Sequence, residues 1–461
     1  MATVVEVNIN DINEDTFCGE PFLGLSTRGI GYVQQCSQIK YIHGIPKKGT
    51  VDGLNIDDGY VYVDGVKQEL FNLKYDDWQE IWNSEYLVDL RDKMLKGIKN
   101  PTCELCFYQK QYAKRFRYIQ DHNKWKDYYT THPNKIELRL SNECNLACRM
   151  CTPINSSIYE KDVIRIDKYK DKELPEWFEK GYVIPAKFVQ KLKKQNVKFL
   201  RDKMEQIEEM IDHARIIEIH GGEPTLEDKI WEKLDSIDLS NKELIMYSNG
   251  MKFDEYHVDI LNRFKKGRVG FSLDVCDESI EYSRWPADWK QIEHNVLNNG
   301  KQLKQDIQID LMTTINVYTM FRIKNVLTWA AEHFGNDNRF SLNFNVVEKP
   351  AYLNPNIVDY DIRQKLVREL ISHGAKTLSK LDSKTKQLWM KKLNKFLKHM
   401  SIKSMYDSIP DSSTLMQQFT RDEIDDEIRK QFFQFTKILD KSRGQDFHTA
   451  LPEFKGILDE K

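Results

Sequence analysis

Short apolar runs recur through the middle of the chain, and stretches with helical spacing of apolar residues separate them. The runs cover residues 135–140, 216–220, 242–247, 268–274, 307–317 and 340–347. Strands that alternate with helices in this way pair in parallel through crossover connections. The six strand–helix units predict an α/β fold with an open, partial (β/α)6 barrel over residues 131–350. Functional side chains are then expected at the carboxyl ends of the strands.

The flanking regions have different patterns. Residues 1–130 predict a small α+β domain, with hairpins over 24–36 and 59–65 and helical spacing over 76–96. The apolar side of that helical stretch comprises Trp78, Ile81, Trp82, Tyr86, Leu90 and Met94. Residues 351–461 predict a helical region, with helices over 362–378, 384–399 and 422–441. We assign this region a structural role, because stripes of Leu and Phe usually serve packing.

Composition narrows the class of protein. The chain has 461 residues, 30% of them charged, and a net charge of −2, which argues against a protein that coats nucleic acid through bulk charge. One basic aromatic run, residues 108–118, could clamp a nucleic acid strand, although a solvated helix face is the commoner use of such a run. Residues 1–10 lack a secretory signal, and no run approaches the ~20 apolar residues of a membrane span. We therefore expect a cytoplasmic protein outside the membrane.

The eight cysteines are accordingly expected to be reduced thiols or metal ligands. Three of them, Cys144, Cys148 and Cys151, lie within residues 141–153, which read SNECNLACRMCTP. Three thiolates this close can face one metal centre from a single loop, and iron–sulfur clusters are the usual occupants of such runs. A zinc site would require a fourth ligand, and a chance grouping of cysteines is the remaining alternative.

This loop resembles the cluster loop of the radical S-adenosylmethionine (radical SAM) enzymes, whose hallmark is Cys-x3-Cys-x2-Cys after the first barrel strand. The later Gly-Gly-Glu-Pro run is identical to the motif that holds the methionine amine of the cofactor in that family. The resemblance covers about residues 134–348 and implies these cofactor-binding residues: Met150, Gly221, Gly222, Glu223, Pro224, Ser248, Asn249, Ser272, Arg284 and Asn316.

The resemblance also implies individual roles. Met150 would lie beside the adenine, Ser272 and Asn316 would contact the ribose, and Arg284 would contact the cofactor carboxylate or the substrate. For each of these residues taken singly, a structural role is the alternative. Asp274 and Asp277 are acid–base candidates by position only. A free thiol at Cys276 could donate a hydrogen atom to a substrate radical, whereas most lone cysteines are small buried residues.

The first 130 residues resemble the SPASM/twitch module of the same superfamily, which here precedes the barrel although the family places it afterwards. By that resemblance, one auxiliary [4Fe–4S] cluster is expected, held by four upstream cysteines: Cys18, Cys36, Cys103 and Cys106. A four-cysteine zinc ribbon is the alternative.

The family's chemistry implies a function. A [4Fe–4S] cluster bound to S-adenosylmethionine would reductively cleave it to a 5′-deoxyadenosyl radical, which abstracts a hydrogen atom from a substrate. A peptide or protein is the first substrate class, and an electron donor such as flavodoxin or ferredoxin is the expected partner. Radical modification of a small molecule or nucleotide, or a non-enzymatic zinc-ribbon binding protein, are the alternatives.

Overall fold

The computed structural model describes residues 16–27, 31–36, 44–51, 54–57, 60–100, 103, 106, 132–152, 155–168, 204–402 and 421–458. The fold is mixed α/β, and its main sheet has eight strands that are mostly parallel. The chain forms two compact units that interleave along the sequence. The first comprises Met1–Asn142, Lys191–Met246 and Arg263–Lys266, and the second Glu143–Gln190, Tyr247–Asn262 and Gly267–Lys461.

The first unit contributes five strands in the order β8-β7-β6-β1-β2. These are β1 (Gly24–Thr27), β2 (Val33–Gln34), β6 (Lys135–Arg139), β7 (Ile216–His220) and β8 (Glu243–Ser248). Strand β6 pairs in parallel with both β1 and β7, and β7 pairs in parallel with β8. The predicted first hairpin is confirmed, because β1 and β2 are antiparallel. Its partner β6 was not anticipated, since nothing local to residues 24–36 encodes that pairing.

The remainder of this unit confirms local patterns. A small antiparallel sheet joins β3 (Leu54–Asp57), β4 (Tyr60–Val63) and β5 (Val66–Lys67). The turn between β4 and β5 has positive φ at Asp64 (50°) and Gly65 (77°), as an Asp-Gly hairpin turn requires. The predicted helical stretch forms α2 (Trp78–Trp82) and α3 (Glu85–Leu95), and its six predicted apolar side chains are all buried.

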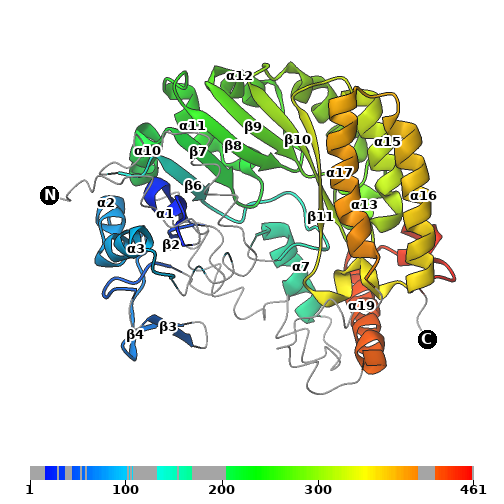
Figure 1. The fold of residues 1–461 in the computed structure, drawn as a ribbon, viewed down its shortest axis with the longest axis horizontal. Coiled ribbons are helices and arrows are strands. Elements are labelled where there is room, and N and C mark those ends of the chain that lie inside the picture. Colours follow the sequence, from blue (N-terminus) through cyan, green and yellow to red (C-terminus); the bar gives the residue numbers. More distant parts are fainter. Residues whose placement is uncertain are drawn as a thin grey trace. The chain divides into compact units, whose positions relative to one another are not determined.

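Side-chain caps explain why this stretch divides into two helices. Asp77 accepts hydrogen bonds from the backbone of Gln79 and Glu80 at the start of α2, and Ser84 accepts one from Leu87 at the start of α3. Helices α10 (Met204–His213) and α11 (Asp228–Ser236) complete the described part of the unit, and Figure 1 shows them beside β7 and β8.

A polar ladder crosses the sheet of the first unit. Lys135 Nζ lies 3.1 Å from both Glu20 Oε2 and Glu218 Oε2, and His220 Nε2 lies 2.7 Å from Glu218 Oε1. Burial alone would raise the pKa of Glu218, but the hydrogen bond from His220 and the charge of Lys135 lower it to about 2. The folded protein therefore binds the Glu218 proton less readily than the unfolded chain does.

The stability that Glu218 contributes is therefore expected to depend on pH. It is present above pH ~4.5 and is lost as the pH falls towards ~2, because the folded pKa lies below the unfolded one. Glu218→Gln should lower the free energy of unfolding by roughly 3 kcal/mol at pH 7, measured by urea titration, and by less at pH 3. Glu243→Gln, which removes a more exposed partner of Lys266, is the control and should lose under ~1 kcal/mol. Equal losses for the two variants at pH 7 would contradict this account.

The second unit contributes three strands in the order β9-β10-β11, all parallel. They are β9 (Lys266–Phe271), β10 (Ile307–Ile315) and β11 (Phe340–Val346). All six predicted barrel strands are thus present, with ends that differ by up to three residues from the predicted ones. Short helices α12 (Glu255–Arg263), α13 (Ile280–Ser283) and α14 (Trp289–His294) connect them.

Two longer helices, α15 (Ile323–Phe334) and α17 (Ser383–Met400), pack against β11, and a third, α16 (Tyr360–Leu378), packs against both of these helices. Figure 1 shows them as a row beside that strand. Aromatic rings form the contact, because Phe340 stacks on Phe334 at 4.5 Å and lies 5.5 Å from Trp389. The expected helices of the C-terminal region are therefore confirmed in this part. Burying each such side chain stabilises the fold by roughly 1.5–3 kcal/mol.

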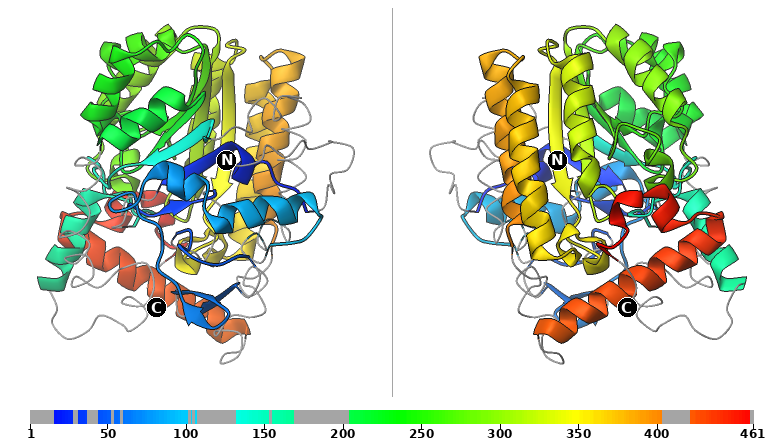
Figure 2. Two further views of the ribbon diagram at one scale, coloured as in Figure 1. Left: turned by 90° about the vertical axis from the view of Figure 1, so that its left-hand side faces the viewer. Right: turned by 90° about the vertical axis from the view of Figure 1, so that its right-hand side faces the viewer.

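The last described segment contains α19 (Arg421–Arg443) and α20 (Phe447–Ala450). Helix α19 packs against α7 (Ser157–Lys168), the helix that follows the three clustered cysteines. Both views in Figure 2 show α7 beside one end of α19. Among the described residues, no helix is long and apolar enough to cross a membrane. The basic run at residues 108–118 lies outside the described residues.

Candidate functional site

The cysteine loop, defined here as Cys144 to Cys151, is anchored through its backbone. The N–H of Ala147 donates to the carbonyl of Trp285 at 2.6 Å, and the N–H of Arg149 donates to the carbonyl of Ser283 at 2.8 Å. The hydroxyl of Ser157, at the start of α7, lies 3.2 Å from both the N and the O of Cys144. These contacts hold the loop by both ends, so its sulfur atoms have defined surroundings.

Hydrogen-bond donors approach two of the three loop sulfurs. The N–H of Leu146 donates to Cys144 Sγ at 3.4 Å, and Asn249 Nδ2 lies 4.0 Å from the same atom. Arg284 Nη1 lies 3.7 Å from Cys148 Sγ. A neutral thiol has little need of donors, whereas a thiolate bound to a metal is stabilised by them. The chemistry of this donor set therefore fits a cluster held by three thiolates.

Without a metal, the thiols of Cys148 and Cys151 are expected to be protonated. Removal from water, together with the neighbouring Cys148, raises the pKa of Cys151 to about 12, and burial also raises the pKa of Cys148. Metal binding would therefore release protons. Within the described residues, no three Cys, His, Asp or Glu side chains are gathered at metal-binding geometry, either in the cysteine loop or among the upstream cysteines.

A buried ion pair lies next to Cys148. Arg284 Nε and Nη2 donate to the two carboxylate oxygens of Asp274 at 2.7 and 2.8 Å, and the N–H of Thr314 donates to Asp274 Oδ1 at 2.9 Å. Burial would lower the pKa of Arg284, but the carboxylate of Asp274 raises it above its usual value. Because Asp274 engages two nitrogens of this guanidinium, only Nη1 faces the sulfur.

The predicted residues at other strand ends also lie in the second unit. Asn249 Nδ2 donates to Asn145 Oδ1 at 2.8 Å, so this side chain contacts the cysteine loop within the second unit. The N–H of Ser272 donates to the carbonyl of Ser248 at 2.8 Å. Asn316 is fully buried, and its Nδ2 has no hydrogen-bond partner in the described structure. Such an orphaned donor at a strand end is a place where a bound ligand can supply the acceptor.

The Gly-Gly-Glu-Pro turn belongs to the first unit and follows β7. Gly221 has φ of 145°, and a Cβ there would lie 3.2 Å from the carbonyl oxygen of Ser141, so glycine suits this position. Glu223 is buried and caps the 3-10 turn Pro224–Leu226, because its carboxylate accepts from the N–H of Thr225 at 3.2 Å and from its hydroxyl at 2.8 Å. The structure therefore shows a capping role for Glu223, and its contact with a cofactor amine stays a prediction.

The acid–base candidates have contrasting surroundings. Cys276 is buried, and burial raises the pKa of its thiol well above the usual value, so it is a neutral thiol. Asp277 accepts hydrogen bonds from Ser279 and Asn325 and lies 3.6 Å from Arg322. It lines an open cavity of about 640 Å³, whose other walls include Glu278, Glu281 and Arg322 and residues that follow α19.

The remaining predicted residues have fewer described contacts. Met150 is partly exposed in the cysteine loop, and Gly222 is partly exposed in its turn. The four upstream cysteines are also partly exposed thiols. Sequence reasoning missed Arg149 and Asp440, which connect the cysteine loop to α19, and Arg443, which connects α19 to α7. The only local signal was one charged residue, Arg149, within the run CNLACRMC.

Comparison with known proteins gives likenesses of fold only. No family model matches the sequence, and no curated protein is significantly similar to it. Among solved structures, the chain is similar to anSMEcpe with bound AdoMet and Cp18Cys peptide, at 17% identity and a TM-score of 0.30, over 52% of this chain and 59% of that one. It is also similar to Streptococcus suis SuiB bound to precursor peptide SuiA, at 14% identity and a TM-score of 0.32, over 68% and 65% of the two chains.

A third similar structure is TYW1 with a lysine-pyruvate adduct bound, at 16% identity and a TM-score of 0.27, over 51% of this chain and 72% of that one. The chain spans about six-tenths of the length of the first structures that it matches. At these identities and TM-scores the likenesses assign no activity to this chain.

Proposed function

We propose that this protein is a radical SAM enzyme. The observation that carries the proposal is the cysteine loop itself, in which three closely spaced thiols follow a barrel strand and donors approach Cys144 and Cys148. When bound and reduced, a [4Fe–4S] cluster would supply the electron that splits S-adenosylmethionine into methionine and a 5′-deoxyadenosyl radical, the species that would take a hydrogen atom from the substrate.

The chain's own residues would bind and orient these groups. Cys144, Cys148 and Cys151 would hold the cluster, and Arg284 would keep positive charge beside Cys148 because Asp274 fixes its orientation. The orphaned amide of Asn316 would donate to a ribose oxygen. Glu223 would accept from the cofactor amine, with Met150, Ser248, Asn249, Ser272 and the glycines of its turn shaping the site, as the sequence motifs imply.

A second cluster completes the proposal. Residues 1–130 would act as an auxiliary-cluster domain, 131–350 as the catalytic barrel and 351–461 as a helical region. Cys18, Cys36, Cys103 and Cys106 would hold one [4Fe–4S] cluster with every iron ligated. Four-cysteine zinc ribbons have similar spacing at the Cys103/Cys106 end, so zinc is the competing occupant of this site.

The substrate class follows from the module type. Radical SAM proteins with such modules mostly modify peptides or proteins, and the open cavity beside Asp277 provides space for a side chain to enter. Modification of a small molecule or nucleotide is the alternative within this class. The proposal places the protein in the cytoplasm, with a flavodoxin or ferredoxin as its electron donor. A zinc-ribbon binding protein without activity is the competing function.

Metal and product analysis of the full chain tests this proposal. After anaerobic reconstitution, the protein should contain iron and acid-labile sulfide in equal amounts, and it should release 5′-deoxyadenosine from S-adenosylmethionine when dithionite is added. Protein reconstituted without sulfide is the control and should release none. A protein that takes up zinc, lacks sulfide and leaves S-adenosylmethionine intact would refute the enzyme assignment and favour the binding protein.

A further inference from the structure

Two arginine side chains are buried where the end of α19 meets the cysteine loop. Arg149 lies between Cys148 and Met150 in the loop, and Arg443 is the last residue of α19. Neither side chain has any exposed surface. Buried guanidinium groups remain charged and need acceptors for their N–H groups, so their partners reveal what each side chain does.

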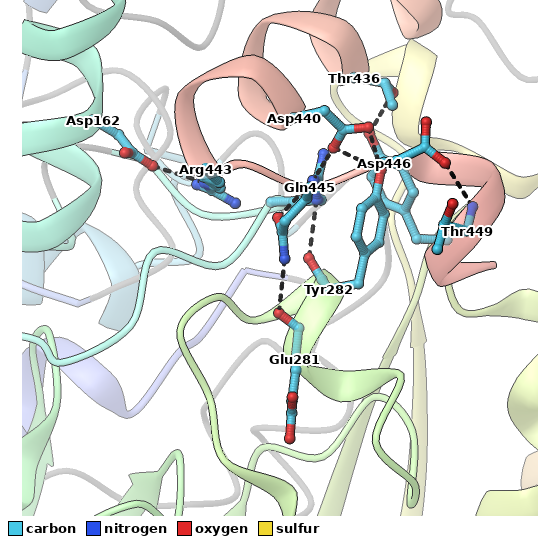
Figure 3. Close-up of polar contacts among 11 residues, drawn as sticks. Asp162, Glu281, Tyr282, Thr436, Asp440, Arg443, Gln445, Asp446 and Thr449 are labelled. Carbon is cyan, nitrogen blue, oxygen red and sulfur yellow. Dashed lines mark hydrogen bonds and ion pairs between the residues drawn. The ribbon is translucent and has the colours of Figure 1, made fainter.

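Arg149 ties the loop to the second unit's C-terminal segment. Its Nη2 donates to Asp440 Oδ1 and, at 2.9 Å, to Gln445 Oε1, and its Nε donates to the carbonyl of Tyr282 at 2.9 Å. The guanidinium also lies 3.7 Å from the centre of the Tyr282 ring. Figure 3 shows Gln445 reaching down to Glu281 while Asp440 faces Tyr282. Protein groups thus accept from Nε and Nη2 of Arg149, and its Nη1 is buried without a hydrogen-bond partner among the described residues.

Arg443 is satisfied on one side only. Its Nε donates to Asp162 Oδ2 of α7 at 2.8 Å, as Figure 3 shows. The rings of Tyr159 and Trp285 lie 5.5 and 5.3 Å from its guanidinium carbon. Both Nη1 and Nη2 are buried and have no hydrogen-bond partner within the described part of the chain. Unpaired buried donors are destabilising, and native proteins seldom keep them without an acceptor.

The surroundings of Arg443 point towards the cysteine loop. Trp285, whose ring lies against the guanidinium, also accepts the backbone hydrogen bond from Ala147. Asp440, which lies three residues before Arg443 on α19, accepts a hydrogen bond from Arg149 of the loop. An anionic group held by this loop would therefore lie within the electrostatic reach of Arg443.

We propose that Arg443 supplies N–H donors and positive charge to the cluster held by Cys144, Cys148 and Cys151, and thereby raises its reduction potential. This inference rests on the proposed function. A cluster with three thiolates is anionic, and one-electron reduction by an external low-potential donor adds a further negative charge. A buried cation nearby stabilises the reduced form more than the oxidised form, because the reduced form carries more negative charge. Arg443, at the end of α19, would thus set the reduction potential of the cluster that drives the reaction.

The potential can be measured without turnover. Redox titration of the reduced-cluster EPR signal gives the midpoint potential, and the signal that vanishes in the variant lacking Cys144, Cys148 and Cys151 identifies the loop cluster. Arg443→Gln should shift that midpoint to a more negative value, with at least a tenfold change in the reduction equilibrium, which is about 59 mV for one electron. Arg443→Lys keeps the charge and should retain most of the wild-type value.

Two further variants separate charge from structure. Arg429→Gln is the matched control, because Arg429 lies on the same helix and pairs with Asp359, and it should leave the midpoint unchanged. Asp162→Asn breaks the same ion pair as Arg443→Gln but removes a negative charge, so it should shift the midpoint to a more positive value. A purely structural role would shift Asp162→Asn and Arg443→Gln in the same direction, and that result would overturn the proposal.

The remaining outcomes are also decisive. An unchanged midpoint potential in Arg443→Gln protein with a full complement of cluster would refute the inference. If that variant also binds S-adenosylmethionine more weakly, the result would assign Arg443 to the cofactor carboxylate instead. If Arg443→Gln loads no loop cluster, a wild-type midpoint in Arg443→Lys supports the proposal, and failure of Arg443→Lys to load overturns it. Wild-type protein without iron and sulfide would instead refute the proposed function itself.

Discussion

Replacing Cys144, Cys148 and Cys151 together with alanine is expected to abolish the release of 5′-deoxyadenosine from S-adenosylmethionine. The reason is that no other thiols in the loop can hold the cluster that reduces the cofactor. The assay is product quantification by chromatography under dithionite. Asn155→Ala is the control, because Asn155 is exposed and follows the loop without offering a thiol. Residual cleavage by the triple variant above that of sulfide-free protein would show that these cysteines are not the ligands.

The same triple variant reports on the upstream cysteines. If Cys18, Cys36, Cys103 and Cys106 hold an auxiliary cluster, the variant should retain about four irons with an equal amount of sulfide per chain. Zinc in place of iron would favour the ribbon. The two sites are thereby assayed separately in one protein, since loss of cleavage and retention of iron come from different parts of the chain.

Asp274→Asn is expected to destabilise the protein by about 3–5 kcal/mol, which is the usual effect of removing one partner of a buried ion pair. Asp274 is fully buried and accepts from two nitrogens of Arg284, so the variant leaves a buried cation with a neutral partner. The measurement is urea unfolding of iron-free protein, which separates folding from cluster binding. Activity should fall as well, because Arg284 would lose the orientation that points Nη1 at Cys148.

Two further variants test the cause. Asp92→Asn breaks an ion pair with Lys96 in which both side chains are more than half exposed, and it should lose under ~0.5 kcal/mol. The double variant Asp274→Asn with Arg284→Met should regain part of the lost stability, because it removes the unpaired charge. Equal losses for Asp274→Asn and Asp92→Asn would mean that the buried pair contributes little.

Local sequence determined the elements of this fold. Periodicity located all six barrel strands and the long helices α16, α17 and α19. It also placed Trp78, Tyr86 and Met94 on one buried side of α2 and α3, because a helix repeats its facing every three to four residues. The caps at Asp77 and Ser84 act over two or three residues, so the local sequence contains the information for them. The break between the two helices was nevertheless not predicted.

The cysteine loop shows how much of the candidate site could be predicted from the sequence. The spacing of its thiols predicted a metal centre, and the resemblance of this loop and of the Gly-Gly-Glu-Pro turn to a family's motifs implied the cofactor. The structure adds what approaches the sulfurs, namely the amide of Asn249 and the guanidinium of Arg284. Glu223 illustrates the reverse case, because the structure shows it as a cap, a role that the motif did not predict.

Tertiary structure alone decided the contacts between distant segments. Strand β1 lies beside β6 although more than a hundred residues separate them, and the hairpin pattern of residues 24–36 encodes only its own turn. Arg149 is hydrogen-bonded to Asp440, which is 291 residues away in the sequence, and Asp162 is hydrogen-bonded to Arg443 at a comparable separation. A charged residue in a periodic pattern reads as solvent-facing unless the partner that buries it is known. Periodicity indicates which side of a helix or strand is buried. Which other segment covers that side depends on how the whole chain packs.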